Sequence, residues 1–480
     1  MNIEHVEKSY QELESDSTLQ NLIAQANARY ILYNTEESKE NFPRYTIKDE
    51  QLNILAFKYL NIGCNYFSEH NYLKASHSLE KGALILEYIH GSIHIQTKNK
   101  KLFCLISALS YYVCFQYSKA FILIGKLESD TMISSLVSLF LNRKFDQLLS
   151  EIDKLITNSS YGDEYLAEHF EEDNATKIYE IIIAKSLNYY VQFYQTGNKD
   201  FLEIAKKDLV NLQEVAAMRG EPDVWWVIRL LLLIIDGFKE SSLWYVLGNY
   251  FNTEDKLPLK YIQSLVYKNG SITELFLTQR NSLPKVLNNK QGSIVSIPTS
   301  SGKTRIGEIA ILNCLLNEPK AKILFIAPYR SLAYEIENSF DEIFSNLDVS
   351  VSHLYGGSLF SKLDERIIDE SSVIVATPEK AKALFRSNED ILSCIKLVII
   401  DEGHLLGTDK RLIVNEMFYE ELKYHVKANG GRFLLLSAVL PNAEDLSEWL
   451  TDSTDNVYKE NWRPSDERIG IMEWNGMEFL

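Results

Sequence analysis

Two polar segments in the C-terminal half of the chain have residue types and a spacing suited to binding nucleotide phosphates. The first, Pro298-Thr299-Ser300-Ser301-Gly302-Lys303-Thr304, directly follows the apolar segment Ser293–Ile297. A loop of this composition between a strand and a helix surrounds phosphate with backbone N–H groups and with the helix N-terminus. Lys303 would neutralise the β- and γ-phosphates and Thr304 would bind magnesium. We predict that the loop's nucleotide-binding residues are Thr299, Ser300, Ser301, Gly302, Lys303 and Thr304.

The second segment, Asp401-Glu402-Gly403-His404, closes the apolar run Lys396–Ile400. Two adjacent carboxylates at the end of a buried strand cost several kcal/mol unless a partner compensates their charge. Mg²⁺ is such a partner: Asp401 would hold the metal, and Glu402 would orient and activate the attacking water. Taken alone, a solvated strand end is the alternative interpretation. Together with the loop, the segment predicts hydrolysis of ATP with Mg²⁺ as cofactor.

The tripeptide Gly302-Lys303-Thr304 is weak as an isolated signal, because average composition produces such a triplet often by chance. The first glycine that is common in such loops is also missing, since Ile297 occupies its place. A polar strand-to-helix turn is therefore the alternative. The strand before the loop and the amphipathic stretch Ile306–Leu315 after it favour phosphate binding. Upstream, the Gln279 amide could bond both N6 and N7 of adenine, which would select ATP, although a lone glutamine is more often a surface residue.

Short β-branched segments alternate with helical stretches from about residue 271 onward, a pattern that predicts a parallel sheet with crossover helices. The expected strands are Ser293–Ile297, Lys322–Ala327, Val349–His353, Ser372–Ala376, Lys396–Ile400 and Arg432–Ser437. Ligands of such sheets gather at the carboxyl ends of the strands, where both polar segments lie. The boundary is expected near Lys268-Asn269-Gly270, and Ser271 with Glu274 would form a capping box that starts the next helix.

Residues 1–270 are predicted to be all helical, because proline is scarce and apolar residues recur at spacings of three and four. Between residues 56 and 130 the pattern resembles tetratricopeptide-type helical hairpins. The residues that carry it are Tyr59, Ile62, Gly63, Tyr66, Tyr72, Ala75, Leu79 and Gly82, and part of the spacing recurs at Ala108, Tyr111, Tyr117 and Ala120. The offset is 45 residues instead of the usual 34. We expect irregular hairpins that bind a protein partner; an ordinary helical bundle is the alternative.

The composition fits a multidomain globular protein of 480 residues with 46% hydrophobic residues. The formal net charge of −17 implies that nucleic acid would be bound by a local groove instead of a bulk positive field. Five cysteines without a Cys-x-x-Cys pair argue against a disulfide scaffold and fit the reducing cytoplasm. The apolar run at 224–235 is too short to cross a membrane and contains Arg229, so a buried helix is expected.

These motifs resemble superfamily 2 helicases of the DExH type, in particular the branch of exosome-associated RNA helicases and archaeal repair helicases, over roughly residues 271–470. The resembling segments are Gln279 (adenine-reading glutamine), 298–304 (motif I), 327–333 (motif Ia), Gly356-Gly357, 377–380 (motif Ib), 401–404 (motif II), 437–442 (motif III) and 462–464 (exit from the first motor domain). The resemblance implies a RecA-like domain and nucleic-acid-dependent ATPase activity.

The resemblance also implies contacts with single-stranded DNA or RNA through Arg330, Thr377 and the N–H groups near Gly356 and Gly357. Such contacts go to phosphate. For Arg330 alone, a helix-cap cation is the alternative. His404 and Ser437 would couple the ATP site to the nucleic-acid site. Val439 stands where the family has a threonine, so translocation is favoured over efficient unwinding.

The family's second motor domain supplies arginines to the ATP site, and the segment after Arg463 is too short to form such a domain. Residues 471–480 are expected to begin the connector to that domain. The alternatives are a piece of a longer protein or a half-motor completed by a partner. Antiviral helicases of the Hachiman type also have a long N-terminal extension before such a motor, which would imply a defence role and a partner nuclease. A rival function is a protein-interaction adaptor whose nucleotide domain is a slow switch.

Overall fold

A computed structural model describes residues 3–34, 49–92, 100–127, 131–158, 172–352, 362–387, 393–405 and 410–463. The chain forms two compact units. The helical unit comprises Met1–Asn249 with Leu265–Glu274, and the sheet unit comprises Tyr250–Ser264 with Leu275–Leu480. The predicted boundary near residue 270 falls within the segment Leu265–Glu274, which belongs to the helical unit.

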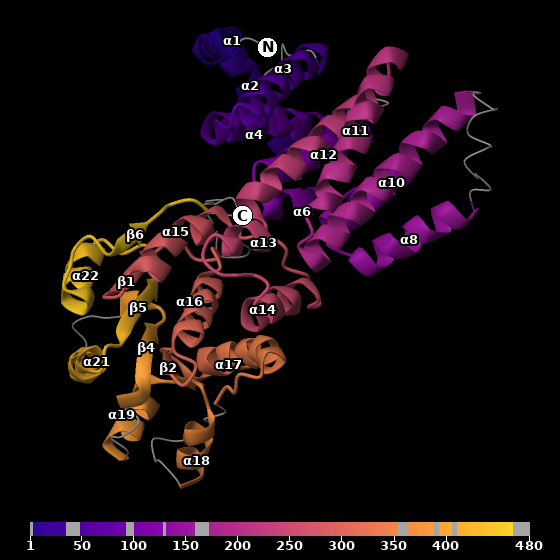
Figure 1. The fold of residues 1–480 in the computed structure, drawn as a ribbon. Coiled ribbons are helices and arrows are strands. Elements are labelled where there is room, and N and C mark those ends of the chain that lie inside the picture. The colour runs from indigo at the N-terminus through magenta and orange to yellow at the C-terminus, as the bar shows by residue number, and fades with distance from the viewer. Residues whose placement is uncertain are drawn as a thin grey trace, which may run out of the picture. The chain divides into compact units, whose positions relative to one another are not determined.

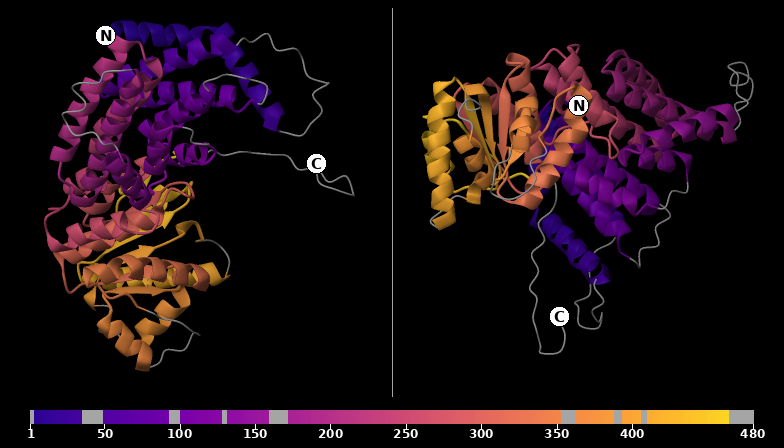
Figure 2. Two further views of the ribbon diagram at one scale, coloured as in Figure 1. Left: turned by 90° about the vertical axis from the view of Figure 1, so that its right-hand side faces the viewer. Right: turned by 90° about the horizontal axis from the view of Figure 1, so that it is seen from below.

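The helical unit is built from helices throughout its described part, as the sequence predicts, and Figure 2 shows them from two further sides, drawn from indigo to magenta. In order they are α1 (Ile3–Ser15), α2 (Ser17–Asn34), α3 (Asp49–Ser68), α4 (Tyr72–His90), α5 (Lys100–Val113), α6 (Tyr117–Gly125), α7 (Met132–Leu141), α8 (Phe145–Asn158), α10 (Glu172–Thr196), α11 (Asp200–Arg219), α12 (Pro222–Ser241) and α13 (Leu243–Gly248). The apolar run at 224–235 lies in α12 and is largely buried. No helix in the described ranges is long and apolar enough to cross a membrane.

The two predicted hairpins are present as α3–α4 and α5–α6. The small residues allow α3 and α4 to approach closely, as expected. A Cβ added at Gly63 would lie 2.5 Å from Leu79 Cγ, and one added at Gly82 would lie 2.7 Å from Leu60 Cδ2. Larger side chains at these positions would force the two helices apart.

The segment that leads out of the helical unit differs from the prediction, because Ser271 and Glu274 do not form a capping box. The next helix, α15 (Leu277–Asn288), begins only after Phe276. The Glu274 carboxylate is instead buried in the helical unit, where it accepts hydrogen bonds from Tyr112 and Tyr194 and pairs with Arg143. A buried carboxylate with several donors is satisfied without a helix N-terminus, which the local sequence pattern does not reveal.

The sheet unit contains six parallel strands in the order β3-β2-β4-β5-β1-β6, which confirms the predicted RecA-like α/β architecture. The strands are β1 (Gly292–Ser296), β2 (Lys322–Ile326), β3 (Val373–Ala376), β4 (Ile395–Ile400), β5 (Arg432–Ser437) and β6 (Val457–Lys459). The expected strand Val349–His353 is reduced to one bridge between Val351 and Val373, and His353 lies outside the described residues. The edge strand β6 has no sequence signal of its own, since it is only three residues long.

Helices cover both faces of this sheet (Figure 1). On one face α19 (Pro378–Ser387), α21 (Lys410–Ala428) and α22 (Ala443–Thr451) pack with apolar side chains of all the neighbouring strands. On the other face α16 (Lys303–Asn317) and α17 (Arg330–Phe344) pack on Phe325 of β2. Two further helices of the unit are α14 (Lys256–Val266) and α18 (Lys362–Glu370). This three-layer arrangement fixes the carboxyl ends of the strands at one edge.

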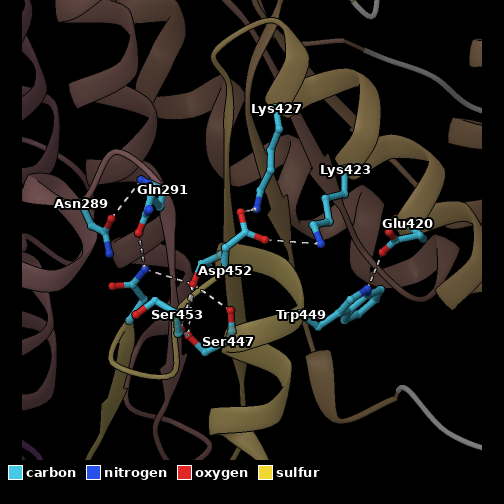
Figure 3. A network of polar contacts seen from close by, with 11 residues as sticks. Asn289, Gln291, Glu420, Lys423, Lys427, Ser447, Trp449, Asp452 and Ser453 are labelled. Atoms are coloured by element: carbon cyan, nitrogen blue, oxygen red, sulfur yellow. Dashed lines mark hydrogen bonds and ion pairs between the residues drawn. The ribbon is translucent and has the colours of Figure 1, made fainter.

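A polar network closes the turn between α22 and β6 (Figure 3). Asp452, in the left-handed conformation that ends α22, pairs with Lys423 and Lys427 of α21. The Asn456 amide donates to Thr451 Oγ1 at 3.0 Å and to Gln291 Oε1 at 3.4 Å. The network therefore ties α21 and α22 to the residue that precedes β1.

Candidate nucleotide site

The predicted phosphate loop connects β1 to the N-terminus of α16, so its backbone N–H groups and the helix dipole converge on one point. Ser300 and Gly302 have φ values of 67° and 72°. Only glycine adopts this left-handed conformation without cost, which explains Gly302 at the start of α16. Thr299 and Ser300 are exposed, whereas Lys303 is 9% exposed. The Ser301 hydroxyl is buried and has no hydrogen-bond partner among the described residues.

Gln279 lies against this loop, as expected for a residue of the nucleotide site. Its Nε2 donates to the Gly302 carbonyl at 3.0 Å, and its Oε1 accepts from the Phe276 N–H at 2.9 Å. An amide group has two donor hydrogens and two acceptor lone pairs. One donor hydrogen and one acceptor lone pair of Gln279 therefore remain after both bonds to the protein are made.

The predicted metal and water-activating carboxylates lie at the carboxyl end of β4, separated from β1 by β5 alone. Glu402 Oε2 accepts a hydrogen bond from Lys303 Nζ at 3.2 Å. The two polar segments, about a hundred residues apart in sequence, thus meet through one ion pair. Glu402 itself has a φ of 52°, a conformation that costs energy for a residue with a side chain.

His404 and Ser437 extend this contact to β5; their role as coupling residues stays a prediction. His404 Nδ1 lies 3.2 Å from Glu402 Oε2 and 3.4 Å from Ser437 Oγ. A chain of polar contacts therefore runs from Lys303 through Glu402 and His404 to Ser437. It links the phosphate loop with the end of β5, from which the next motif continues.

The carboxylate of Asp401 is the buried member of the acidic pair. Its side chain accepts the Glu402 N–H at 2.9 Å and is 8% exposed. Burial, followed by the neighbouring Glu402 charge, raises the pKa of Asp401 to about 6. A divalent cation would remove this electrostatic cost, so the residue fits a magnesium ligand. In the described ranges no group of three or more His, Cys, Asp or Glu residues could hold a metal, and Mg²⁺ commonly uses one or two protein ligands plus phosphates and water.

The residues expected to contact nucleic acid follow the neighbouring strands β2 and β3. Arg330 is exposed at the first position of α17, and Thr377 precedes α19, where its Oγ1 accepts from the Lys380 N–H at 3.4 Å. The Ala327 N–H donates to the Ala376 carbonyl, which brings the two strand ends together. Gly356 and Gly357, the other predicted contacts, lie outside the described residues.

A cavity of about 300 Å³ borders the acidic pair at the ends of β2, β3 and β4. Its wall includes Pro328, Tyr329, Pro378, Asn415 and Tyr419. The first three belong to segments with a motif resemblance. Asn415 and Tyr419 of α21 were missed, and their only signal is a spacing of four residues that places both on one helix face.

Comparison with known proteins agrees with these motifs. Residues 277–446 match the family described as DEAD/DEAH box helicase. The chain is 41% identical to the Hachiman protein HamB of Bacillus cereus over 98% of its own length and 41% of that protein. It is 33% identical to the ATP-dependent DNA helicase Hel308 of Thermococcus kodakarensis over 45% of its length and 18% of that protein. The solved DEAD-box helicase Mss116, bound to ssRNA and UDP-BeF, is 20% identical over 44% of each chain, with a TM-score of 0.36.

The chain thus spans less than half the length of the curated relatives that it matches. Its similarity to HamB extends through the helical unit, whereas the similarity to Hel308 covers less than half of the chain. The resemblance derived from the motifs is confirmed: the chain carries a superfamily 2 DEAD/DEAH box helicase domain and is a homologue of HamB over nearly its whole length.

Proposed function

We propose that this chain is the ATP-binding part of a nucleic-acid-dependent ATPase that translocates on or unwinds nucleic acid once a second RecA-like domain is supplied. The observation that carries the proposal is the 3.2 Å contact between Lys303 of the phosphate loop and Glu402 of β4. The contact supports the proposal because Lys303, the proposed phosphate-binding residue, lies beside Glu402, the proposed water-activating residue, as hydrolysis of ATP requires.

The roles of the residues follow from their positions. The N–H groups of residues 299–304 bind the phosphates, and Lys303 neutralises them. Thr304 and Asp401 would hold Mg²⁺, which when bound supplies charge neutralisation at the phosphates. Because a phosphate group competes with Glu402 for Lys303, nucleotide binding frees the Glu402 carboxylate to orient water. Gln279 would use its remaining donor and acceptor to select adenine.

Nucleic acid would bind along the carboxyl ends of β2 and β3. A cation at a helix N-terminus is unfavourable to the helix, so the position of Arg330 on α17 does not support the helix-cap alternative. An exposed guanidinium beside a helix N-terminus is instead suited to a phosphate of single-stranded DNA or RNA. Thr377 at the start of α19 offers a second phosphate contact on the neighbouring strand.

The proposal also concerns the whole protein. The similarity to HamB supports a role in antiviral defence in the cytoplasm, in which the helical unit binds a protein partner, with a nuclease as the candidate. Arginines of the second domain would complete the ATP site, and such groups contribute on the order of 10³–10⁵ in rate in related hydrolases. The chain without that domain is therefore expected to hydrolyse ATP weakly.

The test is ATP hydrolysis by the purified chain and by the chain joined to its second domain, with and without single-stranded DNA or RNA. Lys303→Ala serves as the inactive variant, and Lys320→Ala, an exposed lysine of the same unit, is the matched control. Stimulation by one nucleic acid in the complete protein, lost in Lys303→Ala alone, supports the proposal. Binding of ATP without any stimulated turnover in the complete protein would favour the adaptor with a nucleotide switch.

A further inference from the structure

The N-terminal helix α1 is bound to the α3–α4 hairpin through two carboxylates that lie seven residues apart. Both oxygens of Glu7 accept from Lys74 Nζ at 2.7 Å, and Glu7 also accepts from the Tyr66 hydroxyl at 2.7 Å. Glu14 repeats this arrangement two turns later, with Lys81 Nζ at 2.6 Å and the Tyr59 hydroxyl at 3.0 Å. The hairpin therefore presents two lysine–tyrosine pairs, each matched to one carboxylate of the same helix face.

The next hairpin, α5–α6, binds a helix by the same chemistry. Lys119, 45 residues after Lys74, donates to Glu80 of α4 at 2.6 Å. Tyr111, 45 residues after Tyr66, donates to Glu87 of α4 at 3.2 Å. Glu80 and Glu87 are again seven residues apart, but here the lysine and the tyrosine bind different carboxylates. In both hairpins the lysine also lies over the tyrosine ring, at 5.6 Å for Lys74 over Tyr66 and 5.4 Å for Lys119 over Tyr111.

The two bound helices differ in how firmly they are held. Val6 and Leu13 are the only buried residues of α1, whereas α4 buries ten residues, in part because it also packs against α3 within its own hairpin. The ion pairs of α1 are also partly solvated, since the side chains of Glu7 and Lys74 are 34% and 37% exposed. Partly exposed ion pairs contribute little to stability. The α1 helix is thus fastened by specific contacts but by little apolar area, as expected for a helix that can be exchanged.

We propose that the α3–α4 surface is a binding site for an acidic amphipathic helix of a partner protein, with two carboxylates seven residues apart, and that α1 occupies this site as a competitor within the chain. The inference rests on the partner-binding role proposed above for the helical unit and names the chemistry of that partner. It does not depend on the ATP site, so the two proposals are tested by different measurements.

The probe is a fluorescent peptide of residues 1–16 with a lactam between Lys8 and Glu12. These two side chains lie 3.9 Å apart and are 76% and 66% exposed on α1, so the link fixes the helix without touching the hairpin. Fluorescence anisotropy would measure its affinity for the full chain. The double variant Glu7→Lys/Glu14→Lys should release α1 and bind the peptide about tenfold or more tightly than the unchanged chain does.

The reciprocal variant Lys74→Glu/Lys81→Glu should no longer bind the native peptide. It should bind a peptide in which Glu7 and Glu14 are replaced by lysine about tenfold more tightly than the unchanged chain binds that peptide. The control Glu12→Lys/Glu69→Lys makes the same charge change at exposed positions and should leave peptide affinity unchanged. Circular dichroism verifies folding of each variant. The chain with all four substitutions should bind the lysine-substituted peptide as weakly as the unchanged chain binds the native peptide. In both chains α1 and the hairpin carry opposite charges, so α1 occupies the site.

Equal peptide affinity for the unchanged chain and for Glu7→Lys/Glu14→Lys would overturn the proposal. So would a lysine-substituted peptide that gains nothing with the reciprocal variant. If light scattering shows a dimer that the peptide dissociates, the occupant is α1 of a second copy, and the assignment to a partner protein is wrong. ATP turnover is measured on the complete protein carrying the same substitutions, so that failure of the ATPase proposal is recognised separately from loss of peptide binding.

Discussion

Replacing Gly302 by alanine tests whether the Gln279 contact positions the phosphate loop. Gly302 has a φ of 72°, and a Cβ added there would lie 2.2 Å from Gln279 Nε2. Because that atom ends a flexible side chain, the amide would move away and give up its bond to the Gly302 carbonyl. The expected damage is thus a lost hydrogen bond together with the cost of a left-handed alanine.

Gly430 provides a matched control, since it has a φ of 74° and nothing within 4 Å of an added Cβ. Both alanine variants pay roughly 1–2 kcal/mol for the left-handed conformation. Gly302→Ala should lose a further 0.5–1.5 kcal/mol, roughly the net value of one hydrogen bond. ATP affinity should fall about twofold to tenfold in Gly302→Ala, because the same free energy holds the loop in its binding conformation. It should stay unchanged in Gly430→Ala.

Hydrogen exchange of peptides covering β1 and α16 measures the opening free energy of this part of the sheet unit. Binding of a fluorescent ATP analogue measures affinity. In a Gln279→Ala background the extra loss at Gly302 should disappear, and the double-mutant cycle isolates the contact. If Gly302→Ala and Gly430→Ala lose equal stability, or if the cycle shows no coupling, the contact with Gln279 does not position the loop.

Four further outcomes follow from the site and its neighbouring motifs. Glu402→Gln in the complete protein should keep ATP binding within about twofold but lower turnover by roughly 10² or more. The exposed control Glu448→Gln should change neither ATP binding nor turnover. Retained turnover in Glu402→Gln contradicts the assigned role. Asp401→Asn should stabilise the nucleotide-free protein by at most about 3 kcal/mol at pH 8. The pKa of Asp401 in the folded protein, about 6, lies above its usual value, so the unchanged protein loses stability as the pH rises from about 4 to 6, whereas the variant does not. Urea unfolding at pH 4 and pH 8 measures the difference. Arg330→Ala should weaken the binding of single-stranded nucleic acid about equally for all sequences. The salt dependence of the binding constant should fall by close to one phosphate contact, which titrations at several salt concentrations would show. Val439→Thr should raise unwinding per ATP hydrolysed in the complete protein, and an unchanged ratio in a coupled assay would refute this.

Most of the sheet architecture was predictable because five of the six strands carry a local signal and precede a motif or a polar loop. Five of the expected strands are present within one or two residues of the predicted bounds. The expected strand at Val349 is only a bridge, since it pairs through Val351 alone. The edge strand β6 depends on its pairing with β1 and not on composition, so no window of sequence could identify it.

The position of the candidate nucleotide site at one sheet edge was predictable, but its internal contacts were not; the roles of its residues stay predictions. The positions of Lys303 and Glu402 were expected at one sheet edge, yet nothing in their spacing indicates that they pair directly. The error at Glu274 has the same origin, because its partners Tyr112, Arg143 and Tyr194 are 80 or more residues away. Long-range partners of buried charges are set by packing, which a local pattern such as a capping box does not contain.

The conformation of Glu402 indicates why the acidic pair is followed by glycine. Glu402 adopts a φ of 52°, and a Cβ added at Gly403 would lie 2.6 Å from Leu435 Cδ1 of β5. The close approach of this glycine to β5 fixes the turn and holds Glu402 in its strained conformation. Because His404 then lies within 3.4 Å of both Glu402 and Ser437, the strain is maintained where the nucleotide and the next motif meet. Phosphates that take Lys303 from Glu402 would leave His404 as the remaining partner of that carboxylate. Binding or release of the nucleotide would thereby change the contact between Glu402 and His404, and His404 also contacts Ser437 of β5.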